Sequence, residues 1–280
     1  MASEYLAPFV KYFEKPEHQA FSLTGGSPAA LLVHGFPGSP AETRPMGLAL
    51  QSAGWSVEGI LLPGFGEQIG TLFERHYTEW SAAITARLRY LKSEHHPVLL
   101  AGFSMGATLA LQASISEKPD ALVLLAPFWK LEGRLWSLLP FLRVVFPKIH
   151  PFRLVKMDFS DPEFRKGMDN FMPGVDLDDP EVLQGMRDFA IPIGIIDEIR
   201  RAGLAAWQAA PQANLPVLVL QGIADELVKP HLTRQLLQRL PGPIQYAELN
   251  AAHDLLDSSR PAWPEVETAV TRFASEICTA

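Results

Sequence analysis

The sequence predicts an α/β domain, with a mostly parallel sheet, helices on both faces of the sheet and an inserted helical cap. Short apolar runs rich in Val and Leu alternate with longer amphipathic segments, and this is the element order of a doubly wound sheet. The runs are continuously apolar, as expected of strands that are covered on both faces. A long stretch rich in proline and aromatic residues interrupts the alternation. Residues 1–125 and 214–280 are therefore expected to form the two parts of the core, and residues 126–213 the cap.

The individual elements follow in chain order. The apolar runs predict strands at Ala29–Val33, Trp55–Leu62, Val98–Gly102, Ala121–Leu125, Val217–Leu220 and Ile244–Leu249. The amphipathic segments predict helices at Glu42–Ala53, Thr78–Glu94, Ala107–Glu117, Pro230–Leu240 and Pro264–Ile277. Strands that are joined by such helical crossovers run parallel to each other.

The cap region, between Ala126 and Leu215, contains no convincing strand. Asp161-Pro162-Glu163 and Asp179-Pro180-Glu181 each have an acidic N-cap followed by proline at the first helical position, a pattern typical of a helix start. Apolar spacing predicts a further helix over Ile193–Gln208. An insertion of this length indicates a lid over a binding cleft at the edge where the strands end. The alternative is a stabilising subdomain that lies far from any site.

Composition excludes several classes of function. The chain has 280 residues, of which 48% are hydrophobic, and a net charge of -7 without a cluster of Lys and Arg, so nucleic acid is not an expected partner. The single cysteine, Cys278, cannot form an intramolecular disulfide. Without a His-Glu-x-x-His motif, paired cysteines or a phosphate-binding Gly-Lys loop, no metal and no cofactor are expected. The start has no signal-peptide pattern and no run reaches about 18 apolar residues, so we expect a cytoplasmic protein without a stable membrane span. The oligomeric state stays open.

The segment Gly102–Gly106, Gly-Phe-Ser-Met-Gly, lies where a predicted strand stops and a predicted helix begins. A serine on a sharp strand-to-helix turn exposes its hydroxyl, and the helix N-terminus beside it favours developing negative charge. The small residues on either side make room for the turn. Ser104 is therefore the predicted nucleophile, with an ordinary Gly/Ser turn as the alternative.

A serine nucleophile needs a base to take its proton and a carboxylate to orient that base. His253 follows the last predicted strand and Asp225 follows the strand before it, so both are expected on the same sheet edge as Ser104. Glu226 and Asp254 are rivals for the acid, although Asp254 adjoins His253 and adjacent side chains seldom face each other well. The chain order Ser104, Asp225, His253 belongs to one of the architectures that build this triad.

The oxyanion of an acyl-transfer intermediate needs two backbone N–H donors. One is expected from Met105, which follows the nucleophile. The other is expected from the loop His34–Gly38, where Pro37 has no N–H and Phe36 is therefore the predicted donor. His34 is interpreted as a local hydrogen-bonding support of this loop rather than as a catalytic base.

These residues together resemble the α/β-hydrolase superfamily, over nearly the whole chain. His34–Gly38 looks like its oxyanion loop, Leu62–Gly66 like its turn after the next strand, Gly102–Gly106 like its nucleophile elbow and Gln221–Pro230 like its acid loop. The spacing and the helical insertion are most similar to bacterial carboxylesterases and monoacylglycerol lipases. Phe65 stands where many relatives carry histidine, a departure that affects the polarity of the pocket and not the triad.

The resemblance implies a serine hydrolase that cleaves carboxylic esters with short- to medium-chain acyl groups through an acyl-enzyme on Ser104. Its expected partner is a small-molecule ester, with monoacylglycerols as one candidate class. Acyltransferases and carbon–carbon-bond hydrolases share the triad and stay open as alternatives, as does a non-catalytic binding protein. Dehalogenases and epoxide hydrolases normally have aspartate at the nucleophile position, so Ser104 argues against them.

The start of the cap is strongly apolar. Phe128, Trp129, Leu135 and Trp136 lie close together there and are the expected contacts of an acyl chain or an aromatic acid. Ordinary helix packing is the alternative reading of these side chains. Arg134 and Arg143 interrupt the stretch, which excludes a transmembrane helix and leaves an interfacial contact with a lipid surface open.

Overall fold

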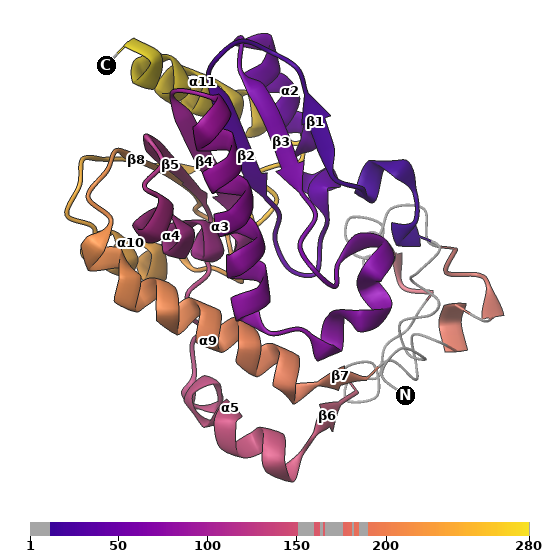
Figure 1. The fold of residues 1–280 in the computed structure, drawn as a ribbon. Coiled ribbons are helices and arrows are strands. Elements are labelled where there is room, and N and C mark those ends of the chain that lie inside the picture. Colours follow the sequence, from indigo (N-terminus) through magenta and orange to yellow (C-terminus); the bar gives the residue numbers. More distant parts are fainter. Residues whose placement is uncertain are drawn as a thin grey trace.

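The computed structural model describes residues 12–150, 160–162, 165, 176–180, 182–184 and 190–279 (Figure 1). A seven-stranded sheet has the order β1-β3-β2-β4-β5-β8-β9. Its strands are β1 (Phe21–Leu23), β2 (Ala29–Val33), β3 (Ser56–Ile60), β4 (Val98–Phe103), β5 (Ala121–Leu125), β8 (Val217–Gly222) and β9 (Ile244–Leu249). β1 pairs antiparallel with β3, and the other neighbours are parallel. The predicted mostly parallel sheet is therefore confirmed.

Burial explains why the strands were recognisable. Every residue of β2, β4, β5 and β8 is buried, because helices cover both faces of the sheet (Figure 1). The edge strand β1 is only three residues long and partly exposed, and the sequence did not predict it.

The helices of the core lie on both sides of the sheet (Figure 1). α2 (Arg44–Ser52) packs against α11 (Trp263–Thr279) on one face, and α3 (Tyr77–Glu94) packs against α4 (Met105–Glu117) on the other. α10 (Pro230–Leu237) follows β8. Short 3-10 helices complete the core: η2 (Pro16–His18), η3 (Pro40–Thr43), η4 (Gly66–Glu74) and η5 (Ala210–Gln212). None of the helices that the structure describes is long and apolar enough to cross a membrane.

The segment that the sequence assigns to the cap, residues 126–213, contains α5 (Arg134–Val145) and α9 (Ile193–Ala209). It also contains the short strands β6 (Lys148–Ile149) and β7 (Ile191–Pro192), which pair antiparallel. The expectation of no strand in this region was wrong, because strands of two residues are too short to leave a periodic pattern. Both predicted helix starts are confirmed: the Arg165 amide donates to the Asp161 carbonyl at 2.9 Å, and the Leu183 amide to the Asp179 carbonyl at 3.0 Å. Glu163 and Glu181 lie outside the described residues.

Two consecutive buried acids hold α9 in place. Asp197 is 2% exposed and accepts from Arg143 of α5 at 3.0 Å. Glu198 is 6% exposed and accepts from the Tyr77 amide, at the first residue of α3, at 3.0 Å. Carboxylates are favoured at a helix N-terminus, where free N–H groups point outward. α9 therefore connects the cap helix α5 to the core helix α3, as its path between them in Figure 1 shows.

Candidate active site

The site lies where the strand order changes direction. From β2 the chain crosses to β3 on one side, whereas β4 lies on the other side of β2. Ligands of open α/β sheets bind in the crevice at such a switch point, at the carboxyl ends of the strands. Val33 of β2 stands beside Gly102 of β4 in the sheet register. The loop after β2 and the turn after β4 are therefore neighbours.

The turn after β4 holds Ser104 in a strained conformation. Its backbone φ is 54° and ψ is -117°, a region that side chains with a Cβ rarely occupy. Its amide donates to the Leu125 carbonyl at 2.8 Å, and its carbonyl accepts from the Phe128 amide at 3.2 Å. These bonds keep the hydroxyl at the N-terminus of α4.

The two glycines of the turn have a steric purpose. A Cβ on Gly102 would lie 2.4 Å from the Gly106 carbonyl oxygen, and a Cβ on Gly106 would lie 2.3 Å from the Val33 carbonyl oxygen. Both contacts are with backbone carbonyl oxygens, which cannot move aside as the end of a flexible side chain can. The Gly-x-Ser-x-Gly pattern thus lets α4 begin directly against β2 and β4.

His253 connects Ser104 to Asp225. Its Nε2 lies 3.0 Å from the Ser104 Oγ, and its Nδ1 lies 2.7 Å from the Asp225 Oδ2. The imidazole is 26% exposed, so water and substrate can reach it. The structure therefore brings the three predicted triad residues together in one line of hydrogen bonds.

Asp225 is completely surrounded by donors. Its side chain is 0% exposed, and its Oδ1 accepts the amides of Leu227 at 2.9 Å and Val228 at 2.8 Å. Its Oδ2 accepts from His253 and from the Gln221 Nε2 at 3.2 Å. A carboxylate oxygen can only accept, so His253 is the donor in this bond and carries its proton on Nδ1. The unprotonated Nε2 is then free to accept the Ser104 hydroxyl proton.

The rival acids do not reach the imidazole. Glu226 is exposed, and Asp254 pairs with Arg260 at 2.7 Å. The orientation of His253 therefore depends on Asp225.

Gln221 is a supporting residue that sequence reasoning missed. Its Nε2 also donates to the Val228 carbonyl at 2.8 Å, and its Oε1 accepts the Thr233 hydroxyl at 2.6 Å. These partners determine which way the amide points, so its NH₂ group faces Asp225. The available signal was a polar residue at the end of an otherwise apolar strand, Val-Leu-Val-Leu-Gln.

The loop after β2 is held by His34, which is fully buried. Its Nε2 accepts the Leu62 amide at 3.2 Å, so its Nδ1 carries the proton and donates to the Gly35 carbonyl at 2.9 Å. Burial lowers the pKa of His34 to about 4, which keeps the ring neutral near pH 7. His34 supports the loop and makes no contact with Ser104 among the hydrogen bonds of the described residues.

The two predicted oxyanion donors lie on this loop and on the elbow. The Gly35 carbonyl belongs to the same peptide group as the Phe36 amide, so the bond from His34 also determines where that N–H points. Neither the Phe36 amide nor the Met105 amide donates to another group within the described part of the chain. The Phe65 ring stands edge-on to the rings of His34 at 4.9 Å and Phe36 at 5.9 Å, so this position supports the loop by packing.

The loop also contacts a carboxyl group that sequence reasoning did not assign to the site. The Oε2 of Glu42, in η3, accepts the Gly35 amide at 3.0 Å. Burial raises the pKa of Glu42 to about 7, although the Gly35 hydrogen bond and the charge of His253 act in the opposite direction.

The aromatic residues predicted to contact substrate separate into two groups. Phe128 follows the elbow and is in edge contact with Trp136, with ring centroids 5.6 Å apart. Trp129 instead stacks on Trp207 at 4.1 Å and donates its indole N–H to the Leu232 carbonyl at 2.8 Å. Those are core-packing contacts, which favours the alternative reading for Trp129. The side chain of Leu135 lies outside the described residues.

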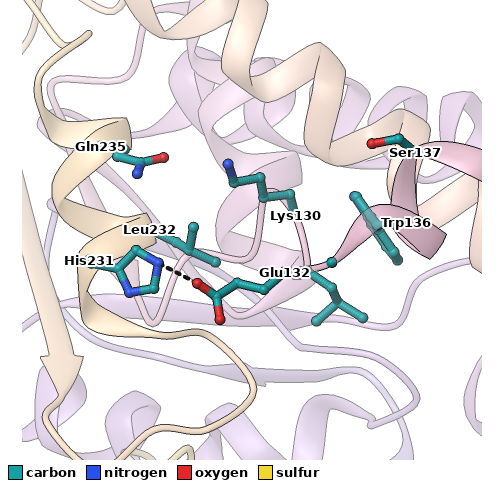
Figure 2. A pocket seen from close by; sticks show the side chains of 9 residues that line it. Lys130, Glu132, Trp136, Ser137, His231, Leu232 and Gln235 are labelled. Atoms are coloured by element: carbon teal, nitrogen blue, oxygen red, sulfur yellow. Dashed lines mark ion pairs between the residues drawn. The ribbon is translucent and has the colours of Figure 1, made fainter.

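Trp136 also lines a cavity of about 340 Å³ between the start of α5 and α10 (Figure 2). Its wall is polar, and Glu132 pairs there with Lys229 at 2.9 Å and with His231 at 2.7 Å. No member of the triad lines this cavity. It is therefore separate from the reacting atoms, with Trp136 between it and the Phe128 ring.

The sheet order, the strained serine turn and the hydrogen-bonded line of Ser104, His253 and Asp225 define the class of α/β hydrolases. The chain belongs to the family described as Serine aminopeptidase, S33, whose model matches residues 27–257. The resemblance predicted from the sequence is thus confirmed.

Two curated relatives match over part of their length. A thermostable monoacylglycerol lipase of Bacillus sp. (strain H-257) is 32% identical over 93 residues, which cover 33% of this chain and 37% of the relative. A carboxylesterase of Bacillus subtilis (strain 168) is 31% identical over 93 residues, 33% of this chain and 38% of the relative. The matched stretches therefore span less than half of either relative.

Solved structures match over nearly the whole chain. One from a study of LipS and LipT, described as metagenome-derived lipolytic enzymes, superimposes with a TM-score of 0.70 at 20% identity and covers 92% of this chain and 98% of its own. At that identity the likeness concerns the fold.

Proposed function

We propose that this chain is a serine carboxylesterase that cleaves esters with short- to medium-chain acyl groups, with Ser104 as the nucleophile. The observation that carries the proposal is the 3.0 Å contact from Ser104 Oγ to His253 Nε2, continued by the 2.7 Å contact from Nδ1 to Asp225. The partial matches to a monoacylglycerol lipase and a carboxylesterase support ester substrates.

In the first step, the Ser104 Oγ attacks the ester carbonyl carbon while its proton passes to the Nε2 of His253. The imidazolium that forms keeps its Nδ1–H bonded to the Asp225 carboxylate, which stabilises the positive charge. The carbonyl oxygen becomes an oxyanion, and the amides of Phe36 and Met105 donate to it. Removing one such donor costs about 3–4 kcal/mol of transition-state stabilisation in comparable enzymes.

In the second step, His253 returns the proton to the leaving alcohol oxygen, and the acyl group stays on Ser104 as an ester. A water molecule then takes the place of the alcohol, and His253 accepts its proton as it attacks the acyl carbon. The partly exposed imidazole gives that water access. The acyl bond to Ser104 then breaks, the acid leaves, and His253 gives the proton from water to the Ser104 oxygen, which restores the hydroxyl.

The acyl group is expected to lie beside the elbow, against the apolar start of the cap. The Phe128 amide donates to the Ser104 carbonyl, so Phe128 lies next to the elbow. The Trp136 ring packs on the Phe128 ring. Apolar and aromatic walls suit a hydrocarbon chain better than a charged group. Monoacylglycerols are one substrate class that fits this surface.

The proposal is tested with p-nitrophenyl esters from acetyl to palmitoyl, using the wild type, Ser104→Ala and the control Ser137→Ala. Ser137 is exposed on the cap and lines the separate cavity. We expect a maximum at short or medium chains that Ser104→Ala abolishes and Ser137→Ala keeps. Activity retained in folded Ser104→Ala would overturn the assignment. Transfer to an added alcohol exceeding free acid would identify an acyltransferase.

A further inference from the structure

Glu42 of η3 packs against the loop that carries the predicted oxyanion donor. Its Oε2 accepts the Gly35 amide at 3.0 Å. A Cβ on Gly38 would lie 1.8 Å from its Oε1, so the carboxyl group is pressed against the last residue of the His34–Gly38 loop. The side chain therefore bridges the two ends of that loop.

The position of Glu42 is itself held by the core. It belongs to η3, where its amide donates to the Ser39 carbonyl at 3.1 Å. The Ser39 hydroxyl caps η3 and contacts the His18 Nδ1 at 2.7 Å. Glu42 thus acts on the loop from a short helix that is tied to η2.

Two side chains determine how the loop is oriented. Glu42 holds the N–H of Gly35, and His34 holds its C=O. Because both groups flank the Gly35 Cα, together they determine the orientation of the peptide group that ends in the Phe36 N–H. The elbow is close by, since a Cβ on Gly35 would lie 3.3 Å from the Ser104 Cβ and 3.5 Å from the Glu42 Oε2.

The carboxyl group is also coupled to the catalytic base. The positive charge of His253 lowers the pKa of Glu42, against the larger rise that burial causes.

The other charged groups near η3 have partners elsewhere. Glu58 of β3 pairs with Arg87, the Arg44 guanidinium of α2 lies over the Phe21 ring, and His34 is neutral. Glu17 acts on its neighbour His18 in η2. The contact of Glu42 that bears on the loop is therefore the hydrogen bond from the Gly35 amide.

We infer that Glu42 is a positioning residue of the oxyanion loop, which acts by holding the Gly35 amide. The inference rests on the proposed ester hydrolysis and adds a residue to its machinery. Glu42 does not touch the reacting atoms, and it acts through Gly35 and Phe36.

The kinetic test compares Glu42→Ala, Glu42→Gln and the control Glu67→Gln, which changes the same charge at an exposed position of η4. Glu42→Ala leaves the Gly35 amide without its acceptor. We expect kcat to fall about 10- to 100-fold with little change in KM, because a misplaced oxyanion donor stabilises the transition state less well. Glu42→Gln keeps an acceptor oxygen, so its plateau kcat should stay within about threefold of the wild type.

A second measurement is independent of activity. His34 is the only histidine that is followed by glycine in the sequence, so labelling with carbonyl-¹³C histidine and ¹⁵N glycine isolates the Gly35 amide in an NMR spectrum. In the wild type and in Glu67→Gln this amide should titrate with a midpoint near pH 7, as Glu42 does. In Glu42→Gln the Gly35 amide signal should no longer change with pH around this midpoint, because glutamine does not titrate.

The outcomes separate the two proposals. If the wild type hydrolyses esters and folded Glu42→Ala keeps its kcat, the inference is overturned. It is equally overturned if the Gly35 amide titrates identically in Glu42→Gln and the wild type. If the wild type hydrolyses no ester, the proposed function fails, and the NMR titration still decides whether Glu42 holds the loop.

Discussion

Replacing Asp225 with asparagine tests the triad through hydrogen-bond geometry alone. The carboxylate accepts from four donors, two on each oxygen. Asparagine has one acceptor oxygen, and the rigid backbone amides of Leu227 and Val228 will take it. The new NH₂ group must then face His253 and Gln221, which are themselves donors in the wild type.

Gln221 cannot resolve this conflict by turning its amide over. Its Oε1 accepts the Thr233 hydroxyl and its Nε2 donates to the Val228 carbonyl, so a flip would break both bonds. His253 must instead accept at Nδ1 and carry its proton on Nε2, where it can no longer receive the Ser104 proton. Enzymes with this wrong tautomer lose about 10⁴ in kcat, which corresponds to about 5.5 kcal/mol in the barrier.

The assay is the hydrolysis of the best p-nitrophenyl ester by Asp225→Asn, with Asp254→Asn as the matched control. Denaturant unfolding of both variants checks that they are folded, and a loss of about 1–3 kcal/mol in Asp225→Asn is expected from the facing donors. The reasoning is refuted if folded Asp225→Asn keeps more than about a tenth of the wild-type kcat. Such a loss would be at most about tenfold, whereas a loss of about 10⁴ is expected. A large loss in Asp254→Asn instead would assign the acid to that residue.

Further predictions concern stability. Gly106→Ala puts a Cβ 2.3 Å from the Val33 carbonyl oxygen and 2.4 Å from that of His34, and denaturant unfolding should show a loss of about 3 kcal/mol; a loss under about 1 kcal/mol would contradict the steric argument. Because the pKa of His34 is lowered from 6.5 to about 4, the unfolded state binds more protons in this range, and the unfolding free energy should fall as pH drops from 6.5 to 4. The slope should be flatter in His34→Gln, and an equal slope would count against a buried neutral histidine. Glu198→Ala removes the acceptor of the Tyr77 amide and should lower Tm, with a loss of about 2–4 kcal/mol; an unchanged Tm would show that the Glu198 contact does not hold α9.

The core was predictable because burial and periodicity agree there. The predicted strand Ala29–Val33 coincides with β2, and Ile193–Gln208 differs from α9 by one residue. The edge strand β1 and the pair β6 and β7 were missed, since three or two residues give no period to detect. Their positions follow from neighbouring segments rather than from local sequence.

The triad positions were predictable for a topological reason. Ser104, Asp225 and His253 each follow a strand, and the carboxyl ends of parallel strands meet at one edge of the sheet. Glu42 and Gln221 could not be assigned in the same way. Their contacts depend on how loops fold back, as when the Glu42 carboxyl reaches the amide of Gly35, and no spacing rule describes that.

The close approach of α9 to the core has a consequence for recombining this chain with its relatives. A Cβ on Gly203 would lie 2.1 Å from the Trp129 carbonyl oxygen, and the Gln112 side chain of α4 donates to the Ala202 carbonyl at 3.0 Å. A foreign α9 without glycine at that position would collide with the segment that leaves β5. Chimaeras that exchange this region should therefore join near Glu132 and Pro192, so that α9 stays with its own sheet and only residues 133–191, which precede α9 in the chain, are exchanged.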